Sequence, residues 1–125
     1  MNGNSFNFDA QWGKSAHIDL MCCEHEYLIS GHVLETYVQE LIRTIGMKAN
    51  GPCYITRAGD PKESLEGYSA MQFIETSSIT VHLDEVKNRA YIDIFSCKNF
   101  DEGKAFDFSK QYFKAQQGKV VVLNR

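Results

Sequence analysis

Residues 75–82 gather four hydroxyl side chains and a histidine in one short segment. These side chains belong to Thr76, Ser77, Ser78, Thr80 and His82. A serine held in strained backbone can attack the carbonyl carbon that precedes it, which converts the peptide bond into an ester. If a base then removes the α-proton of that serine, β-elimination breaks the chain. The segment is therefore a candidate for self-cleavage before Ser77, although strand alternation by itself also fits a half-solvated strand.

Two residues beyond the hydroxyls would complete this chemistry, His82 and Cys97. Elimination leaves dehydroalanine at position 77, which hydrolyses to a pyruvoyl group with loss of ammonia, and a neutral His82 is a suitable proton carrier. A pyruvoyl ketone can form a Schiff base with a substrate amine and accept the electrons of a departing carboxylate. The thiol of Cys97 can then return a proton to the carbanion. We therefore expect the Ser77 hydroxyl, the His82 imidazole and the Cys97 sulfur to converge on the peptide bond between Thr76 and Ser77.

These side chains need a rigid support, and the hydrophobic pattern predicts a sheet with two helices. Strand-like patterns occur at residues 15–22, 53–57, 68–75, 78–83, 89–97 and 119–123. Apolar residues at helical spacing run from Val33 to Ile45, with Ser30 as a possible N-cap and Gly46 as the stop, and a second amphipathic segment covers residues 101–115. The order β-α-β-β-β-β-α-β predicts an α+β fold, a two-layer sandwich in which both helices cover one face of a largely antiparallel sheet.

The turn at residues 84–88 sets the register of the two central strands. Folding the chain about this turn pairs Leu83 with roughly Arg89 and places Ser77 opposite residues 95–97. The hydroxyl segment and Cys97 should therefore be neighbours.

Composition narrows the class of protein. The 125 residues, with 43% apolar content, fit a single domain over residues 1–125. The net charge is −3, and the 13 Lys and Arg residues are scattered, so no basic stripe predicts a nucleic-acid partner. The first 13 residues lack the features of a secretory signal, and no stretch approaches the roughly 20 apolar residues of a membrane span. We expect a cytoplasmic protein that binds neither nucleic acid nor membrane.

The other cysteines and histidines do not have the spacing of a metal site. Cys22, Cys23 and Cys53 lack paired-ligand spacing and are expected to be buried as small hydrophobic residues in a reducing compartment. The three histidines within residues 17–32 also lack a ligand spacing, so we expect no bound metal.

The residues that could do chemistry also match a known pattern. The match consists of Ser77, Ile79-Thr80-Val81-His82, residues 90–97 (Ala-Tyr-Ile-Asp-Ile-Phe-Ser-Cys), and Gly67-Tyr68-Ser69, whose glycine-x-serine element ends eight residues before Ser77. In these segments the chain resembles the prokaryotic S-adenosylmethionine decarboxylases. The resemblance covers roughly residues 15–100 and is strongest over residues 67–97.

This resemblance implies a self-cleaving proenzyme whose covalent cofactor is a pyruvoyl group derived from Ser77. It implies that His82 is the processing histidine, that Cys97 is the catalytic proton donor, and that Ser69 helps in processing and substrate contact. Cleavage between Thr76 and Ser77 would give a β chain (residues 1–76) and an α chain (residues 77–125), which assemble as a homodimer of such pairs. The implied activity is that of a decarboxylase, a lyase of polyamine (spermidine) biosynthesis.

The departures from the family pattern lie near the expected substrate pocket. The family has Glu before and His after the cleavage serine, where this chain has Thr76 and Ser78. The family's ribose-binding Glu follows Thr-Trp-Pro, whereas here the acid comes one residue earlier, within Leu83-Asp84-Glu85-Val86. The family's aromatic residue before the glycine-x-serine element is also missing. We therefore assign substrate binding to Tyr68, Glu63, Glu66 and Glu85, with Phe6, Phe8 or Trp12 as other rings that could stack on adenine.

Three functions remain open at this point. The first is decarboxylation of S-adenosylmethionine. The second is the same machinery acting on arginine or ornithine, because a loop with Asp60, Glu63 and Glu66 would suit a cationic side chain. The third is an unprocessed, non-catalytic regulatory paralogue, an alternative that the unusual Thr76 and Ser78 keep open.

Overall fold

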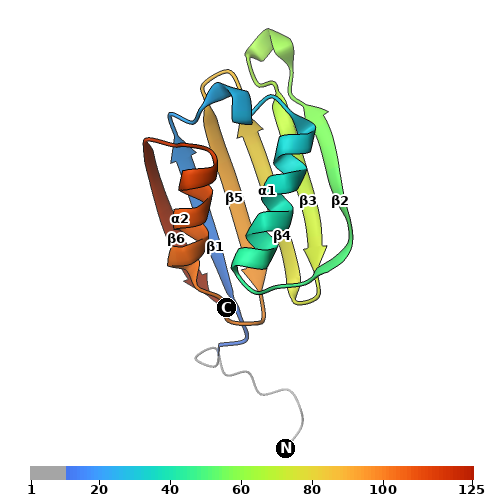
Figure 1. Cartoon of the computed structure of the whole chain (residues 1–125), viewed down its shortest axis with the longest axis vertical. Helices are drawn as coiled ribbons and strands as arrows, with labels where there is room; N and C mark the ends of the chain where they lie inside the picture. Colours follow the sequence, from blue (N-terminus) through green and yellow to red (C-terminus); the bar gives the residue numbers. More distant parts are fainter. Residues whose placement is uncertain (1–10) are drawn as a thin grey trace, which may run out of the picture.

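The structure, a computed structural model, describes residues 11–125 as one six-stranded sheet with both helices on the same face (Figure 1). The strands are β1 (Lys14–Met21), β2 (Ala49–Ala58), β3 (Gly67–Ile74), β4 (Ser77–Asp84), β5 (Arg89–Ser96) and β6 (Gln117–Asn124). The helices are α1 (Gly31–Thr44) and α2 (Glu102–Tyr112), with short 3-10 turns η1 (His25–Tyr27) and η2 (Pro61–Glu63). This order confirms the predicted α+β sandwich.

The strands lie in the order β2-β3-β4-β5-β1-β6, and each adjacent pair is antiparallel. Strands β2 to β5 form a meander because short turns join them, and β1 then lies between β5 and β6. Leu83 pairs with Ala90 and Ser77 pairs with Ser96. The predicted register of the central hairpin is therefore confirmed.

The core lies between the helices and one face of the sheet. Alternate residues of the central strands point toward α1 and α2 and are buried: Ala16, Ile18, Leu20, Ile79, Val81, Leu83, Ala90, Ile92 and Ile94. From α1, Leu34, Val38 and Leu41 meet them at helical spacing. The Ser30 hydroxyl accepts a hydrogen bond from the Val33 N–H at 3.2 Å, so the predicted N-cap is confirmed.

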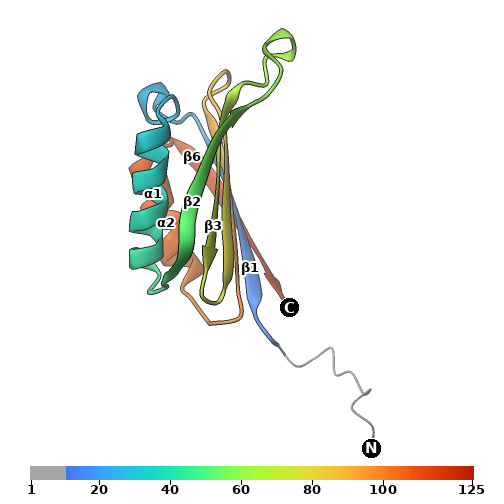
Figure 2. The same ribbon diagram turned by 90° about the vertical axis from the view of Figure 1, so that its right-hand side faces the viewer.

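The opposite face of the sheet, which we call the open face, has no helix over it within the described part of the chain (Figure 2). Large apolar side chains on this face are exposed to solvent: Tyr54, Met71, Phe73, Val121 and Leu123. These side chains lie near the two edges of the sheet, on β2 and β3 and on β6, and exposed apolar side chains grouped in this way are typical of an interaction site. No helix within residues 11–125 is long and apolar enough to cross a membrane.

Two local predictions were wrong. The strand predicted at residues 53–57 begins at Ala49, so the turn-like residues 50–52 lie within β2, where pairing with β3 shifts between Ala49 and Cys53 and Gly51 has φ +86°. Cys22 is exposed with φ +56°, because β1 ends at Met21 and the chain turns there. Cys23 is buried as expected, and burial raises its pKa to about 11.

An ion pair ties β1 to the first turn of α2, and we expect its loss to destabilise the fold. Lys14 is nearly buried, and its Nζ lies 2.6 Å from Glu102 Oε2. Replacing Glu102 with Gln leaves an unpaired, desolvated ammonium group, so the free energy of unfolding should fall by about 1 kcal/mol in urea unfolding. The hydrogen bond from Lys14 lowers the pKa of Glu102 below its ordinary 4.5. The stabilisation should therefore be present above about pH 4.5 and be lost as the pH falls further.

The matched control for this pair is Glu40→Gln, which removes an exposed i,i+3 pair with Arg43 on α1. That change should be within the error of the measurement, because exposed ion pairs contribute little. Equal effects of Glu102→Gln and Glu40→Gln would contradict the prediction.

Candidate active site

The peptide bond between Thr76 and Ser77 lies at the tight turn from β3 to β4. Ile74 pairs directly with Ser77, so only residues 75 and 76 form the turn. Ser77 has φ +151°, a backbone conformation that side-chain-bearing residues rarely adopt. The expected strain is therefore located at the predicted cleavage serine.

Cys97 lies next to this bond through its backbone. The Cys97 N–H donates a hydrogen bond to the Thr76 carbonyl oxygen at 3.0 Å. Cys97 is exposed and follows Ser96, the residue that pairs with Ser77 across β4 and β5. It borders a hollow of about 370 Å³ together with Trp12. The structure thus places the backbone of Cys97 beside the bond between Thr76 and Ser77, as the predicted register of β4 and β5 required; Phe6 and Phe8 lie outside the described residues.

Ser69 and His82 form a second group on the open face. They are register partners on β3 and β4, and the Ser69 hydroxyl lies 2.9 Å from His82 Nδ1. His82 is exposed and pairs with Tyr91 of β5. A hollow of about 350 Å³ is lined by residues that include Ser69, His82, Tyr91 and Leu65. An oriented, solvent-accessible imidazole in such a hollow can carry a proton to or from a bound group.

The two groups do not converge within one chain, which corrects the sequence prediction. Ser77 and His82 are five residues apart on the same strand, β4. At roughly 3.3 Å per residue their backbones are about 16 Å apart, which is beyond the reach of the two side chains. A spacing of five residues within one strand already implies this separation of Ser77 and His82.

The residues predicted to bind substrate gather at a third place, around Arg57. The Arg57 guanidinium pairs with Glu85 and lies 3.6 Å from Glu66, and it stacks over the Tyr68 ring at 5.1 Å. The hydrogen bond from Arg57 lowers the pKa of Glu85. Tyr68 lies near the first residue of α1, Gly31, and so faces away from the open face of Ser69 and His82.

This arrangement departs from the expectation that Glu66, Glu85 and Tyr68 form the substrate pocket. Both carboxylates already have a cationic partner in Arg57, and the ring of Tyr68 is on the helix-covered side. Glu63 lies apart from them in η2. Arg57 was missed in the sequence because nothing local relates it to an acid 28 residues away.

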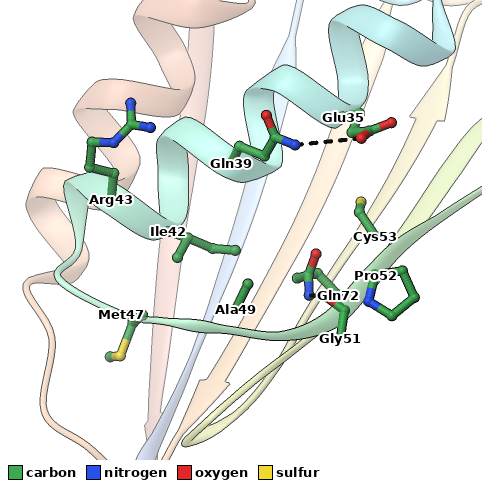
Figure 3. Close-up of a pocket in the computed structure, with 10 residues that line it drawn as sticks. All are labelled: Glu35, Gln39, Ile42, Arg43, Met47, Ala49, Gly51, Pro52, Cys53 and Gln72. Carbon is green, nitrogen blue, oxygen red and sulfur yellow. Dashed lines mark hydrogen bonds between the residues drawn. The ribbon is translucent and has the colours of Figure 1, made fainter.

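Another hollow, of about 510 Å³, lies between α1 and the first half of β2 (Figure 3). Glu35, Gln39, Cys53 and Gln72 lie around it, and burial, followed by the charge of Glu35, raises the pKa of Cys53. Within residues 11–125 no group of three His, Cys, Asp or Glu side chains is placed to hold a metal ion.

Comparison with known proteins finds a matching family model and similar solved structures. The family model described as S-adenosylmethionine decarboxylase matches residues 14–125. The crystal structure of the adenosylmethionine decarboxylase from Aquifex aeolicus VF5 is similar in fold, with a TM-score of 0.78 at 12% sequence identity, covering 92% of this chain and 91% of that chain. Among curated proteins, none matches this chain in sequence.

Proposed function

The chain belongs to the S-adenosylmethionine decarboxylase family, and on that premise we propose that it is made as a proenzyme that cuts its own backbone between Thr76 and Ser77. The cut would give a β chain of residues 1–76 and an α chain of residues 77–125, which begins with a pyruvoyl group formed from Ser77. The proposed reaction is decarboxylation of S-adenosylmethionine in the cytoplasm, for spermidine biosynthesis.

This proposal rests on the hydrogen bond that the Thr76 carbonyl accepts and on the unusual backbone conformation of Ser77. The Cys97 N–H at 3.0 Å draws electron density from the carbonyl and can stabilise negative charge on its oxygen. The φ of +151° at Ser77 represents strain on the order of 1–3 kcal/mol, which is released when the backbone bond breaks. A polarised carbonyl beside a strained serine favours attack by the Ser77 hydroxyl.

The proposed self-cleavage has three chemical steps. The Ser77 Oγ bonds to the Thr76 carbonyl carbon, the C–N bond breaks, and the hydroxyl proton ends on the Ser77 nitrogen. A base removes the Ser77 α-proton, the Cβ–O bond breaks, and the Thr76 carboxylate leaves with its electron pair. The dehydroalanine left at position 77 tautomerises to an imine, and water converts this to the ketone and ammonia.

We assign the role of base to His82, supplied to each Ser77 by a second copy of the chain. The separation of about 16 Å along β4 excludes a direct role within one chain. Position 77 pairs with the buried Ser96 and so belongs to the helix-facing row of β4, whereas His82 is on the open face. Two copies stacked open face to open face, about 10 Å apart, with a twofold axis over the middle of β4, would bring the Ser77 backbone of one copy, which carries the α-proton, to the same end as His82 and Ser69 of the other. Such a homodimer would also bury the exposed apolar side chains of the open face.

After cleavage, residues of this chain would bind the substrate and take part in the reaction. The pyruvoyl ketone, once formed, condenses with the amine of an amino-acid-type substrate and accepts the electrons released with carbon dioxide. Cys97 is exposed beside the Thr76 carbonyl, so its thiol can return a proton near position 77. Trp12 is exposed on the same hollow and can stack on an adenine ring.

The pairing of Arg57 favours S-adenosylmethionine over arginine or ornithine. Glu66 is one of the loop acids that would suit a cationic side chain, and Arg57, which also pairs with Glu85, already offsets its charge. The same machinery acting on a basic amino acid stays a second candidate, supported by the exposed acids of the loop at residues 59–66. An unprocessed regulatory paralogue is the third.

Intact mass and a decarboxylation assay test these proposals in order. The purified protein should consist of two fragments that meet at residues 76 and 77, whereas a regulatory paralogue would remain one chain. Processed protein should release carbon dioxide from S-adenosylmethionine but not from arginine or ornithine. A processed protein that acts on none of the three would refute the substrate assignment, and a chain that stays whole would refute self-cleavage.

A further inference from the structure

A chain of hydrogen bonds lies on the helix-covered side of the proposed cleavage bond. The Lys98 N–H donates to Ser96 Oγ at 3.0 Å, the Ser96 hydroxyl donates to Thr76 Oγ1 at 2.8 Å, and the Thr76 hydroxyl donates to Met47 Sδ at 3.4 Å. The Ser96 hydroxyl also lies 3.9 Å from Met47 Sδ, a longer contact than its bond to Thr76. The bonds therefore fix the rotamer of Thr76 through its side chain.

Met47 lies on the segment between α1 and β2 (Figure 3). The same segment makes a second contact with this turn. The carbonyl oxygen of Lys48 accepts a hydrogen bond from the Glu75 N–H at 2.9 Å. Both residues of the turn, Glu75 and Thr76, are thus anchored to this segment, while the Thr76 carbonyl is anchored to Cys97. Strained backbone persists only where its surroundings hold it in this way.

Ser96 is the polar residue at a position where the pattern of the strand predicts an apolar one. The residues of β5 that face the helices are Ala90, Ile92, Ile94 and Ser96, and all four are fully buried. A buried hydroxyl costs free energy unless it is hydrogen-bonded. An apolar residue here would leave the Thr76 hydroxyl without its donor and held only by its longer bond to Met47 Sδ.

We propose that Ser96 is a positioning residue for self-cleavage, which acts through Thr76 to hold the Thr76 carbonyl against the Cys97 N–H and in reach of the Ser77 hydroxyl. This inference rests on the proposed function of the same site. Ser96 touches no reacting atom. Its effect falls on the first step, the attack of Ser77 Oγ on the Thr76 carbonyl carbon, because that step depends on the orientation of the carbonyl.

The measurement is the rate at which the full chain, made by cell-free synthesis and then chased, turns into fragments 1–76 and 77–125. Ser96→Ala and Thr76→Val should each slow cleavage about fivefold to tenfold, the effect of one neutral hydrogen bond. Ser96→Thr and Thr76→Ser retain the hydroxyls and should restore most of the rate. The double variant should be no slower than the slower single variant, because both changes remove the same bond.

Ser109→Ala provides a matched control for a purely structural effect. Ser109 is also a fully buried serine, and its hydroxyl bonds Tyr37 and the carbonyl of Ala105 within the helix layer. This variant should lower the melting temperature but leave the cleavage rate unchanged. Equal slowing by Ser96→Ala and Ser109→Ala would overturn the proposal.

Hydroxylamine separates the two chemical steps. It cleaves the ester by attacking the Thr76 carbonyl carbon, so it bypasses elimination but not ester formation. Hydroxylamine should therefore fail to restore the cleavage of Ser96→Ala, and full restoration would overturn the proposal. If Ser96→Ala does not fold, Thr76→Val carries the test, since Thr76 is only half-buried. Unslowed cleavage in both variants would refute the role of Ser96 alone, whereas an unchanged chain that never cleaves would refute the proposed function.

Discussion

Replacing Ser77 with alanine is expected to leave a single uncut chain of 125 residues and to abolish decarboxylation completely. The hydroxyl of Ser77 is the proposed attacking group, and position 77 is also the source of the ketone, so one change removes both processing and catalysis. Electrophoresis and intact mass report the cut, and release of carbon dioxide from S-adenosylmethionine reports the activity. Both cleavage and carbon dioxide release should be lost completely.

Ser78→Ala is the matched control, because it removes the neighbouring hydroxyl one position along β4. Ser78 is paired with Phe73 and Phe95 in the regular ladder and is not among the residues with positive φ. The Ser78 variant should still be cut before Ser77. Cleavage of the Ser77→Ala chain, or a cut before residue 78, would contradict the assignment.

The second large effect is complementation between two inactive chains. His82→Ala alone should stay largely uncut, and Ser77→Ala alone should stay uncut. When the two are produced together, the His82→Ala chain should be cut, because its Ser77 meets the His82 of the other copy. Only one site of such a heterodimer is intact, so its activity should be about half that of the unchanged dimer. Chains with different tags allow the heterodimer to be isolated and the cut chain identified.

The control partner is a chain that carries both Ser77→Ala and His82→Ala. Produced with the His82→Ala chain, it supplies no imidazole, and the cut should not appear. Failure of the Ser77→Ala chain to rescue its partner would rule out a shared site. Normal cleavage of His82→Ala by itself would instead remove His82 from the processing step.

The sheet was predictable because its information is local. Strands β4 and β5 are joined by a short turn, so their alternating pattern and the position of the turn fix which residues face each other, including Ser77 and Ser96. The helices were predictable for a similar reason, since Ser30 caps α1 and Gly46 follows it with φ +71°. The bulge in β2 was not predictable in this way, because Asn50-Gly51-Pro52 has the composition of a turn.

In the candidate site, too, the features set by strand register were predictable and the long-range contacts were not. Ser77, Cys97 and the pair of Ser69 and His82 follow from strand register, and the sequence supplied all of them. The contacts of Arg57 with Glu66 and Glu85, and the facing of Tyr68 toward α1, depend on how a loop and a helix fold over the sheet. Residues far apart in sequence leave no periodic signal when they meet, so these contacts were not predictable from the sequence.

The sequence by itself determined the order of elements, the register of the central hairpin, and the candidate residues for self-cleavage and proton transfer. Periodicity and short turns encode these features, because they act between near neighbours in the chain. Only the tertiary structure decided that Ser96 and Met47 both contact Thr76, and that the Lys48 carbonyl holds Glu75. Those relations arise when α1 packs on the sheet and brings the segment before β2 against the turn between β3 and β4.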